Sequence, residues 1–75
     1  RSVLITGGTR GIGYAVAEAL LEQEAEVHVT GTKKNGKGPL GSIFHSCDFS
    51  NTENLEKLCD KFQRENIEVL TVLDN

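Results

Sequence analysis

The spacing of apolar residues changes twice in the first thirty positions, and each change predicts a new element. Val3-Leu4-Ile5 is an uninterrupted apolar run, which is typical of a strand covered on both faces. From Gly11 onward the apolar residues recur at helical spacing, at Ile12, Ala15, Val16, Ala19 and Leu20. We therefore expect a strand, then a helix that buries this stripe and fades near Glu24.

The rest of the chain predicts three more strands and one more helix. The strands are expected at residues 26–30, 43–46 and 67–73. Residues 31–42 have loop composition, with four glycines and the only proline. Ser50-Asn51-Thr52-Glu53 has the capping-box spacing of a helix start, and Leu55, Leu58, Cys59 and Phe62 then share one helix face.

Strands that are joined by helices of this length run parallel, and right-handed crossovers place the helices on the faces of the sheet. The predicted fold class is α/β: a Rossmann-like, partial doubly wound parallel sheet of about four strands with two or three helices. The crossover from Thr30 to Ile43 has no recognisable helix, so a loop or a shortened helix is expected there.

Composition narrows the classes of partner. The net charge of −3 gives no support for a nucleic-acid partner, and no apolar run approaches the roughly 20 residues of a membrane span. The two cysteines form no CxxC pair, so neither a disulfide framework nor a zinc site is indicated. We expect a cytoplasmic chain without a membrane partner. Because it opens at Arg1 and contains no methionine, we interpret residues 1–75 as one segment of a longer protein.

Three glycines, Gly7, Gly11 and Gly13, lie where the first strand passes into the first helix. A helix start offers free backbone N–H groups and the positive end of the helix dipole, and glycine lets a phosphate approach the backbone closely. The usual dinucleotide fingerprint G-x-G-x-x-G does not fit. Gly11-Ile12-Gly13 supplies its first two glycines, but Val16 stands at the position of the third. A diphosphate site is the favoured interpretation, and a turn that only packs helix on sheet is the alternative.

The pattern T-G-x-x-x-G-x-G at Thr6–Gly13 resembles the short-chain dehydrogenase/reductase superfamily in its shorter form. The extended form, which includes sugar epimerases, has glycine where this chain has Arg10. The resemblance extends along most of the chain. It implies that Asp48 stands where the family has an Asp that contacts the adenine, and that Asp74-Asn75 stands where the family has Asn-Asn-Ala-Gly. Asp48 could equally help to start the next helix. The residues expected to bind cofactor are Gly7, Thr9, Arg10, Gly11, Ile12, Gly13, Thr32, Lys33, Asp48, Phe49 and Asn75.

The end of the second strand predicts which dinucleotide binds. NAD-selective sites place an Asp or Glu there for the ribose hydroxyls, whereas this chain has Thr30-Gly31-Thr32-Lys33-Lys34. In the family, a basic residue at the position of Arg10 marks NADP enzymes. NADP(H) is therefore the expected cofactor, while Lys34 and Lys37 are expected to belong to a solvated loop.

The resemblance implies that the parent protein is an NADPH-dependent oxidoreductase acting on a small carbonyl or alcohol substrate, most like reductases of 3-oxoacyl thioesters. In the family the proton donor is a Tyr-x-x-x-Lys pair assisted by a serine, but residue 18, four after Tyr14, is Glu, so no catalytic residue is assigned in this segment. The parent is expected to form homo-oligomers. The alternative function is a non-catalytic module that binds the dinucleotide for structure or sensing.

Two other motifs in the chain have weaker support. Residues 31–38 nearly form a P-loop, but Gly38 replaces its Ser or Thr and Pro39 follows instead of a helix. His45 and Cys47 have the spacing of two ligands on one strand face, yet no third ligand lies near them in sequence, so packing is favoured and no metal is expected. His28 is expected to be a strand residue covered by a helix.

Overall fold

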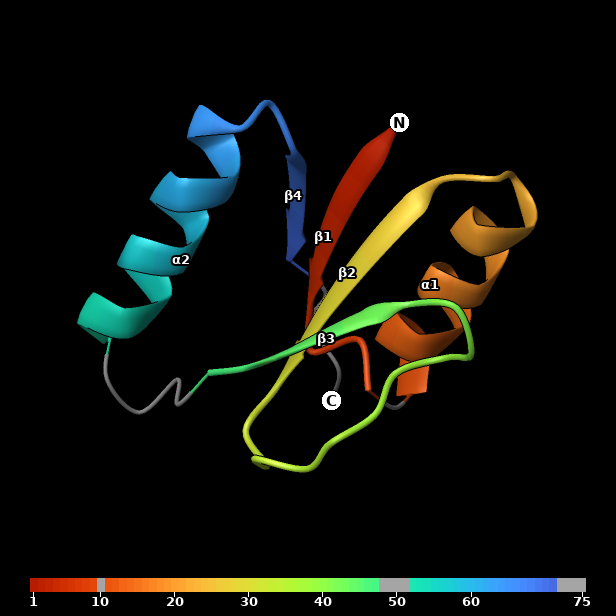
Figure 1. Cartoon of the computed structure of the whole chain (residues 1–75). Coiled ribbons are helices and arrows are strands. Elements are labelled where there is room, and N and C mark those ends of the chain that lie inside the picture. The colour runs from red at the N-terminus through yellow and green to blue at the C-terminus, as the bar shows by residue number, and fades with distance from the viewer. Residues whose placement is uncertain (10, 48–51, 72–75) are drawn as a thin grey trace.

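The computed structural model describes residues 1–9, 11–47 and 52–71 (Figure 1). Its elements follow the predicted order. The strands are β1 (Ser2–Thr6), β2 (Glu26–Gly31), β3 (Ile43–Ser46) and β4 (Glu68–Thr71), and the helices are α1 (Gly11–Glu22) and α2 (Thr52–Arg64). Neither of these helices, within the described residues, has the length and apolarity needed to cross a membrane. The proposed capping residue Ser50 lies outside the described residues.

All strand pairs in the sheet are parallel, in the order β3-β2-β1-β4. The chain therefore moves outward from β1 to β3 and then crosses back to place β4 on the other side of β1. The strand order reverses between β1 and β4, and open α/β sheets bind their ligands outside the carboxyl ends of the strands at such a switch point. The predicted Rossmann-like α/β class is confirmed.

Helices cover opposite faces of the sheet, with α1 on one side and α2 on the other (Figure 1). Because side chains alternate along a strand, β1 and β2 contribute to two separate cores. The core under α1 contains Val3, Ile5, Val27 and Val29 together with Ala17. On the other face the ring of Phe62, from α2, packs edge-on against His28 at 5.1 Å between ring centroids. The expectation that a helix covers His28 is confirmed.

The predicted packing stripe of α1 was wrong by one position. Ile12 is 57% exposed, and Ala15 and Ala19 are exposed as well. The helix instead turns Gly13, Val16, Ala17, Leu20 and Leu21 toward the sheet. The small residues Gly13 and Ala17 are the buried ones because they let the helix axis approach the strands, and a search for large apolar side chains does not detect them.

The second crossover is a loop, as expected, and it covers the sheet by close backbone contact. A Cβ atom added to Gly38 would lie 2.5 Å from Cγ2 of Val29 and 2.6 Å from the hydroxyl of Ser42. The loop therefore lies directly on β2, in the place where a second crossover helix would otherwise pack. Pro39, the next residue, is buried.

Candidate nucleotide-binding site

The turn between β1 and α1 has a backbone conformation that requires glycine. Gly7 has φ of 76° and Gly11 has φ of 62°, both in the left-handed region that side chains disfavour. A Cβ at Gly7 would meet no atom within 4 Å, and Gly7, Gly11 and Ile12 are all exposed. The main chain of the turn is therefore open to a ligand.

The third glycine of the motif, Gly13, allows close packing of α1 on the turn. A Cβ on Gly13 would lie 2.6 Å from the carbonyl oxygen of Gly7, so the first turn of α1 packs directly on the start of the loop. On its other side, the loop is fixed to β2, because the backbone N–H of Gly7 donates a hydrogen bond of 3.0 Å to Oγ1 of Thr30. Thr30 is fully buried. The loop is thus held from two sides in one shape.

The amino ends of the two helices differ in charge. The first turn of α1 contains no acidic residue, whereas the first turn of α2 contains Glu53. A carboxylate in the first turn interacts favourably with the positive end of the helix dipole. At α1 no such carboxylate competes for that end, and an external anion such as a phosphate group could take its place.

The carboxyl end of β2 lies against the same turn. A Cβ on Gly31 would be 2.8 Å from Cγ2 of Thr9, so the loop after β1 and the end of β2 are in contact. Thr32 and Lys33, which follow directly, are exposed. The structure therefore brings together five of the predicted residues, Gly7, Thr9, Gly11, Ile12 and Gly13. Through the contact of Gly31 with Thr9, it also places the start of the segment that carries Thr32 and Lys33 beside them.

Four predicted site residues, Arg10, Asp48, Phe49 and Asn75, lie outside the described residues. Their neighbours in the chain are placed. Thr9 and Gly11 flank Arg10 within the glycine turn, and Cys47, which precedes Asp48, donates its backbone N–H to the carbonyl of Gly31 at 2.9 Å. The ends of β2 and β3 are therefore adjacent at the edge of the sheet where the glycine turn also lies.

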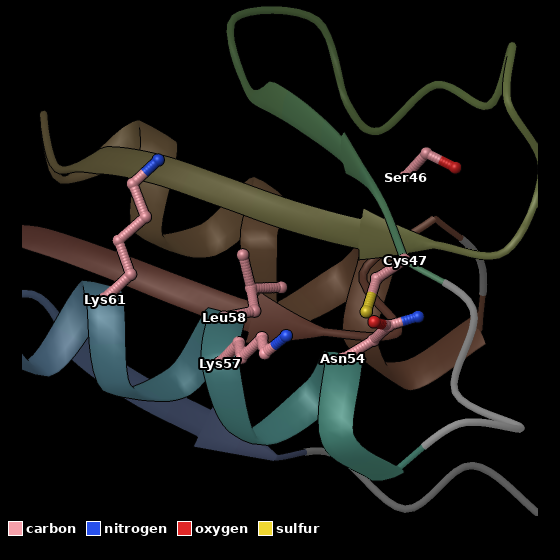
Figure 2. Close-up of a pocket in the computed structure, with 6 residues that line it drawn as sticks. All are labelled: Ser46, Cys47, Asn54, Lys57, Leu58 and Lys61. Carbon is pink, nitrogen blue, oxygen red and sulfur yellow. The ribbon is translucent and has the colours of Figure 1, made fainter.

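A cavity of 320 Å³ lies between the end of β3 and α2, and no described residue of the glycine turn is among those that line it (Figure 2). Its lining residues are Ser46, Cys47, Asn54, Lys57, Leu58 and Lys61. In Figure 2 the thiol of Cys47 lies beside the side-chain amide of Asn54. The ammonium of Lys57 is 3.5 Å from the carboxylate of Glu53, one helical turn before it, so part of the positive charge at this rim is already paired.

Two histidines form a close pair on the face of the sheet under α2. Nδ1 of His28 and Nε2 of His45 are 2.9 Å apart, which is a hydrogen-bond distance, and the rings stack at 5.1 Å between centroids. Burial lowers the pKa of His45 below its ordinary value of 6.5, and the neighbouring His28 and Lys61 lower this pKa further. Among the described residues, no group of three His, Cys, Asp or Glu side chains that could hold a metal ion occurs, either around this pair or elsewhere.

Sequence reasoning missed two residues that shape the site. Thr30 bonds the glycine turn, and its signal was a hydroxyl in an otherwise apolar strand. Phe44, in β3, lies against the glycines that bracket Thr32 and Lys33. The sequence signal for Phe44 was weaker. Only the pairing of β2 with β3 shows that this residue lies opposite Val29, and only the folded loop shows that its ring contacts Gly31 and Gly36.

Comparison with known proteins agrees with this geometry. The model of the NAD dependent epimerase/dehydratase family matches residues 3–70. The 3-oxoacyl-acyl-carrier-protein reductase MabA of Mycobacterium avium is 38% identical over 58 residues, which are 76% of this chain and 22% of that protein. MabA of Mycobacterium tuberculosis is also 38% identical, over 57 residues that make up 22% of its length.

Two solved structures share the fold over the whole chain. The UDP-glucose 4-epimerase of Thermotoga maritima, crystallised with UDP-glucose, superposes with a TM-score of 0.72 at 24% identity and covers 100% of this chain and 25% of its own. A second UDP-glucose 4-epimerase gives a TM-score of 0.70 at 28% identity, over 100% of this chain and 23% of its own. The chain spans about a quarter or less of each relative's length. With its glycine turn, parallel sheet and family match taken together, this chain belongs to the short-chain dehydrogenase/reductase superfamily, whose cofactors are nicotinamide dinucleotides.

Proposed function

We propose that this chain is the NADP(H)-binding part of a short-chain carbonyl reductase or alcohol dehydrogenase, an oxidoreductase that acts on CH–OH groups with NADP as acceptor. The observation that carries the proposal is the open main chain of the glycine turn at the acid-free amino end of α1. The diphosphate of the cofactor would bind there, where backbone N–H groups and the helix dipole both favour an anion.

The reductase subtype is favoured over an epimerase by the spacing of the glycines. The turn has glycine at position 11 and arginine at position 10, whereas the extended form that includes epimerases has glycine at position 10. The 38% identity to MabA over 58 residues supports the same subtype, because MabA is a reductase by name. A 3-oxoacyl thioester, or a carbonyl compound of similar size, is the proposed substrate class of the parent protein.

The preference for NADP over NAD rests on the end of β2. No acidic side chain follows this strand, and the exposed residues Thr32 and Lys33 offer a hydroxyl and an ammonium group instead. A carboxylate there would repel the 2′-phosphate of NADP, while a cation forms a charge-assisted hydrogen bond with it. Thr9 contacts Gly31, so this segment starts beside the turn that would hold the diphosphate.

The nicotinamide would supply the hydride chemistry when bound. This chain's own contribution is binding and orientation: the turn fixes the diphosphate, Arg10, Thr32 and Lys33 recognise the 2′-phosphate, and Asp48 with Phe49 contacts the adenine. Ile12, exposed at the start of α1, and Asn75 would line the path toward the nicotinamide end.

Direct titration tests the proposal. The fluorescence of NADPH and NADH is followed as the full chain is added, and the two dissociation constants are compared. We expect binding of both nucleotides with NADPH the tighter by about ten- to a hundredfold, the effect of one charge-assisted hydrogen bond. Tighter binding of NADH contradicts the NADP assignment, and failure of both nucleotides to bind contradicts the proposed site.

A further inference from the structure

Thr32 and Lys33 are bracketed by two glycines that rest on the same aromatic ring. A Cβ added to Gly31 would lie 3.0 Å from Cε1 of Phe44, and a Cβ added to Gly36 would lie 2.8 Å from the same atom and 2.7 Å from Cζ. These distances are shorter than the normal separation of about 3.5–4.0 Å between carbon atoms in contact, so the ring leaves no room for a side chain at either glycine. Both ends of the segment therefore pack backbone-first against the edge of the Phe44 ring.

A tight turn lies between these two contacts. The backbone N–H of Gly36 donates a hydrogen bond of 3.3 Å to the carbonyl of Lys33, which closes the turn Lys33-Lys34-Asn35-Gly36. Lys33 is thereby linked to Gly36, and Gly36 is seated on Phe44. On the other side, Gly31 ends β2 and also touches Thr9 of the glycine turn. The positions of Thr32 and Lys33 are fixed from both ends.

Phe44 is itself well anchored. It is opposite Val29 in the parallel register of β2 and β3, and its partly buried side chain packs against the core that contains Val29. The ring thus connects the core under α1 to a segment whose side chains are exposed. No charged or hydrogen-bonding group of Phe44 could contact a nucleotide phosphate, so any effect of this residue on nucleotide choice must act through the segment above it.

We propose that Phe44 is a positioning residue for nucleotide selectivity: its ring seats Gly31 and Gly36 so that Thr32 and Lys33 face the 2′-phosphate of NADP(H) beside the glycine turn. The inference rests on the proposed function, because it needs a 2′-phosphate at this place. It predicts that disturbing the contact of the Phe44 ring with Gly31 and Gly36 changes the preference between NADPH and NADH. The diphosphate contacts that the two nucleotides share should stay intact.

Two variants disturb the same contact from opposite sides. Gly36→Ala adds a methyl group where the ring already lies, and the change is in a loop, so the sheet is preserved. Phe44→Leu removes the ring edge while keeping an apolar side chain in the core. Asn35→Ala is the matched control, because it changes an exposed residue of the same turn, does not introduce a Cβ next to Phe44 and leaves the chain's charge unaltered.

The dissociation constants of NADPH and NADH are measured for the full chain and these variants. Both Gly36→Ala and Phe44→Leu are expected to lower the NADPH-over-NADH preference by about tenfold, with NADH affinity changed less than about twofold, since one charge-assisted contact is misplaced. Asn35→Ala should keep the wild-type preference. Without nucleotide, the backbone amide resonances of Thr32 and Lys33 should shift in the first two variants.

The outcomes separate this inference from the function on which it rests. A wild-type chain that prefers NADPH, with both variants keeping that preference, overturns the role of Phe44 alone. Equal weakening of NADPH and NADH in the variants also overturns it, because the ring would then support the whole loop without affecting selectivity. A wild-type chain that binds the two nucleotides equally overturns the proposed NADP preference and this inference together.

Discussion

The backbone N–H of Gly7 donates a hydrogen bond of 3.0 Å to the hydroxyl of Thr30, and this contact joins the glycine turn to the end of β2. Because the N–H of Gly7 is already bonded within the protein, it cannot be the main donor to a bound diphosphate. The donors must come from farther along the turn and from the first turn of α1, where the backbone N–H groups have no partner within the helix.

Thr30→Val tests this arrangement at nearly constant volume. The variant leaves the N–H of Gly7 without its acceptor, so we expect a loss of about 1–3 kcal/mol in stability and weaker binding of both NADPH and NADH. Thr30→Ser keeps the hydroxyl and should restore nucleotide affinity. Urea unfolding and fluorescence titration measure the two effects, and a Thr30→Val chain that binds as tightly as wild type contradicts the role of this bond.

Arg10→Ala addresses the cation within the turn. The proposed function assigns Arg10 to the 2′-phosphate, so its removal should weaken NADPH binding about ten- to a hundredfold and affect NADH binding little. Lys37→Ala, which removes one charge from an exposed loop position, is the matched control. Equal losses for the two nucleotides in the titration would remove the assignment of Arg10.

Gly13→Ala places a methyl group against the turn. The new Cβ would lie 2.6 Å from the carbonyl oxygen of Gly7 and 3.2 Å from Cα of Gly8, so α1 must move away from the loop. We expect a cost of about 1–3 kcal/mol in stability and a marked loss of nucleotide binding. Ala15→Ser, at an exposed position of the same helix, should change neither. Thermal unfolding and titration of both variants check the comparison.

Glu24→Gly should stabilise the chain. Helix α1 ends in a Schellman motif, in which the N–H of Ala25 bonds the carbonyl of Leu20 at 3.2 Å and that of Glu24 bonds Leu21 at 3.0 Å. Glu24 has φ of 65°, where glycine avoids a steric penalty of about 1 kcal/mol. For a domain of this size, the melting temperature should rise by roughly 4–8 °C.

The comparison for this prediction is Asn66→Gly. Asn66 occupies the same position at the end of α2, with φ of 59° and the equivalent bonds from Asn66 to Gln63 and from Ile67 to Phe62. Asparagine tolerates the left-handed region better than glutamate, so the gain at Asn66 should be smaller. Equal gains at the two sites would show that the conformational penalty at Glu24 is not the cause.

The histidine pair predicts a loss of stability in mild acid. Burial, His28 and Lys61 all hold the pKa of His45 below 6.5, so between the two values the unfolded chain binds more protons than the folded chain. Stability is then fully present above pH 6.5 and falls as the pH drops through 6.5 toward the lowered pKa of the folded state. The carboxylate of Glu26 lies 3.3 Å from Nε2 of His28, the ring nitrogen of His28 that does not contact His45.

His45→Gln isolates this contribution, because glutamine does not titrate in this range. Urea unfolding at pH 7.5, 6.5 and 5.5 should show a smaller decline for the variant than for the wild-type chain. Identical pH dependence of the two chains would show that His45 does not carry the effect. Nuclear magnetic resonance of the imidazole protons gives the pKa of His45 in the folded state directly.

Local sequence features predicted the elements and their order. The apolar run before Thr6, the glycines after it and the loop composition of residues 31–42 each define their own structure, because strand, turn and loop preferences are properties of a few neighbouring residues. The predicted strands at 26–30 and 43–46 agree with β2 and β3 to within one residue. The residues expected at the carboxyl edge of the sheet, as far as they are described, also lie there.

The sequence by itself therefore determined which segments are strands and helices and where the glycine turn between β1 and α1 would form. Only the tertiary structure decided which face of α1 is buried, that Thr30 bonds Gly7, and that Phe44 lies under the segment carrying Thr32 and Lys33. These relationships depend on how closely two backbones approach and in which register strands pair. Such distances are set by the packing of residues far apart in the chain, and no local pattern encodes them.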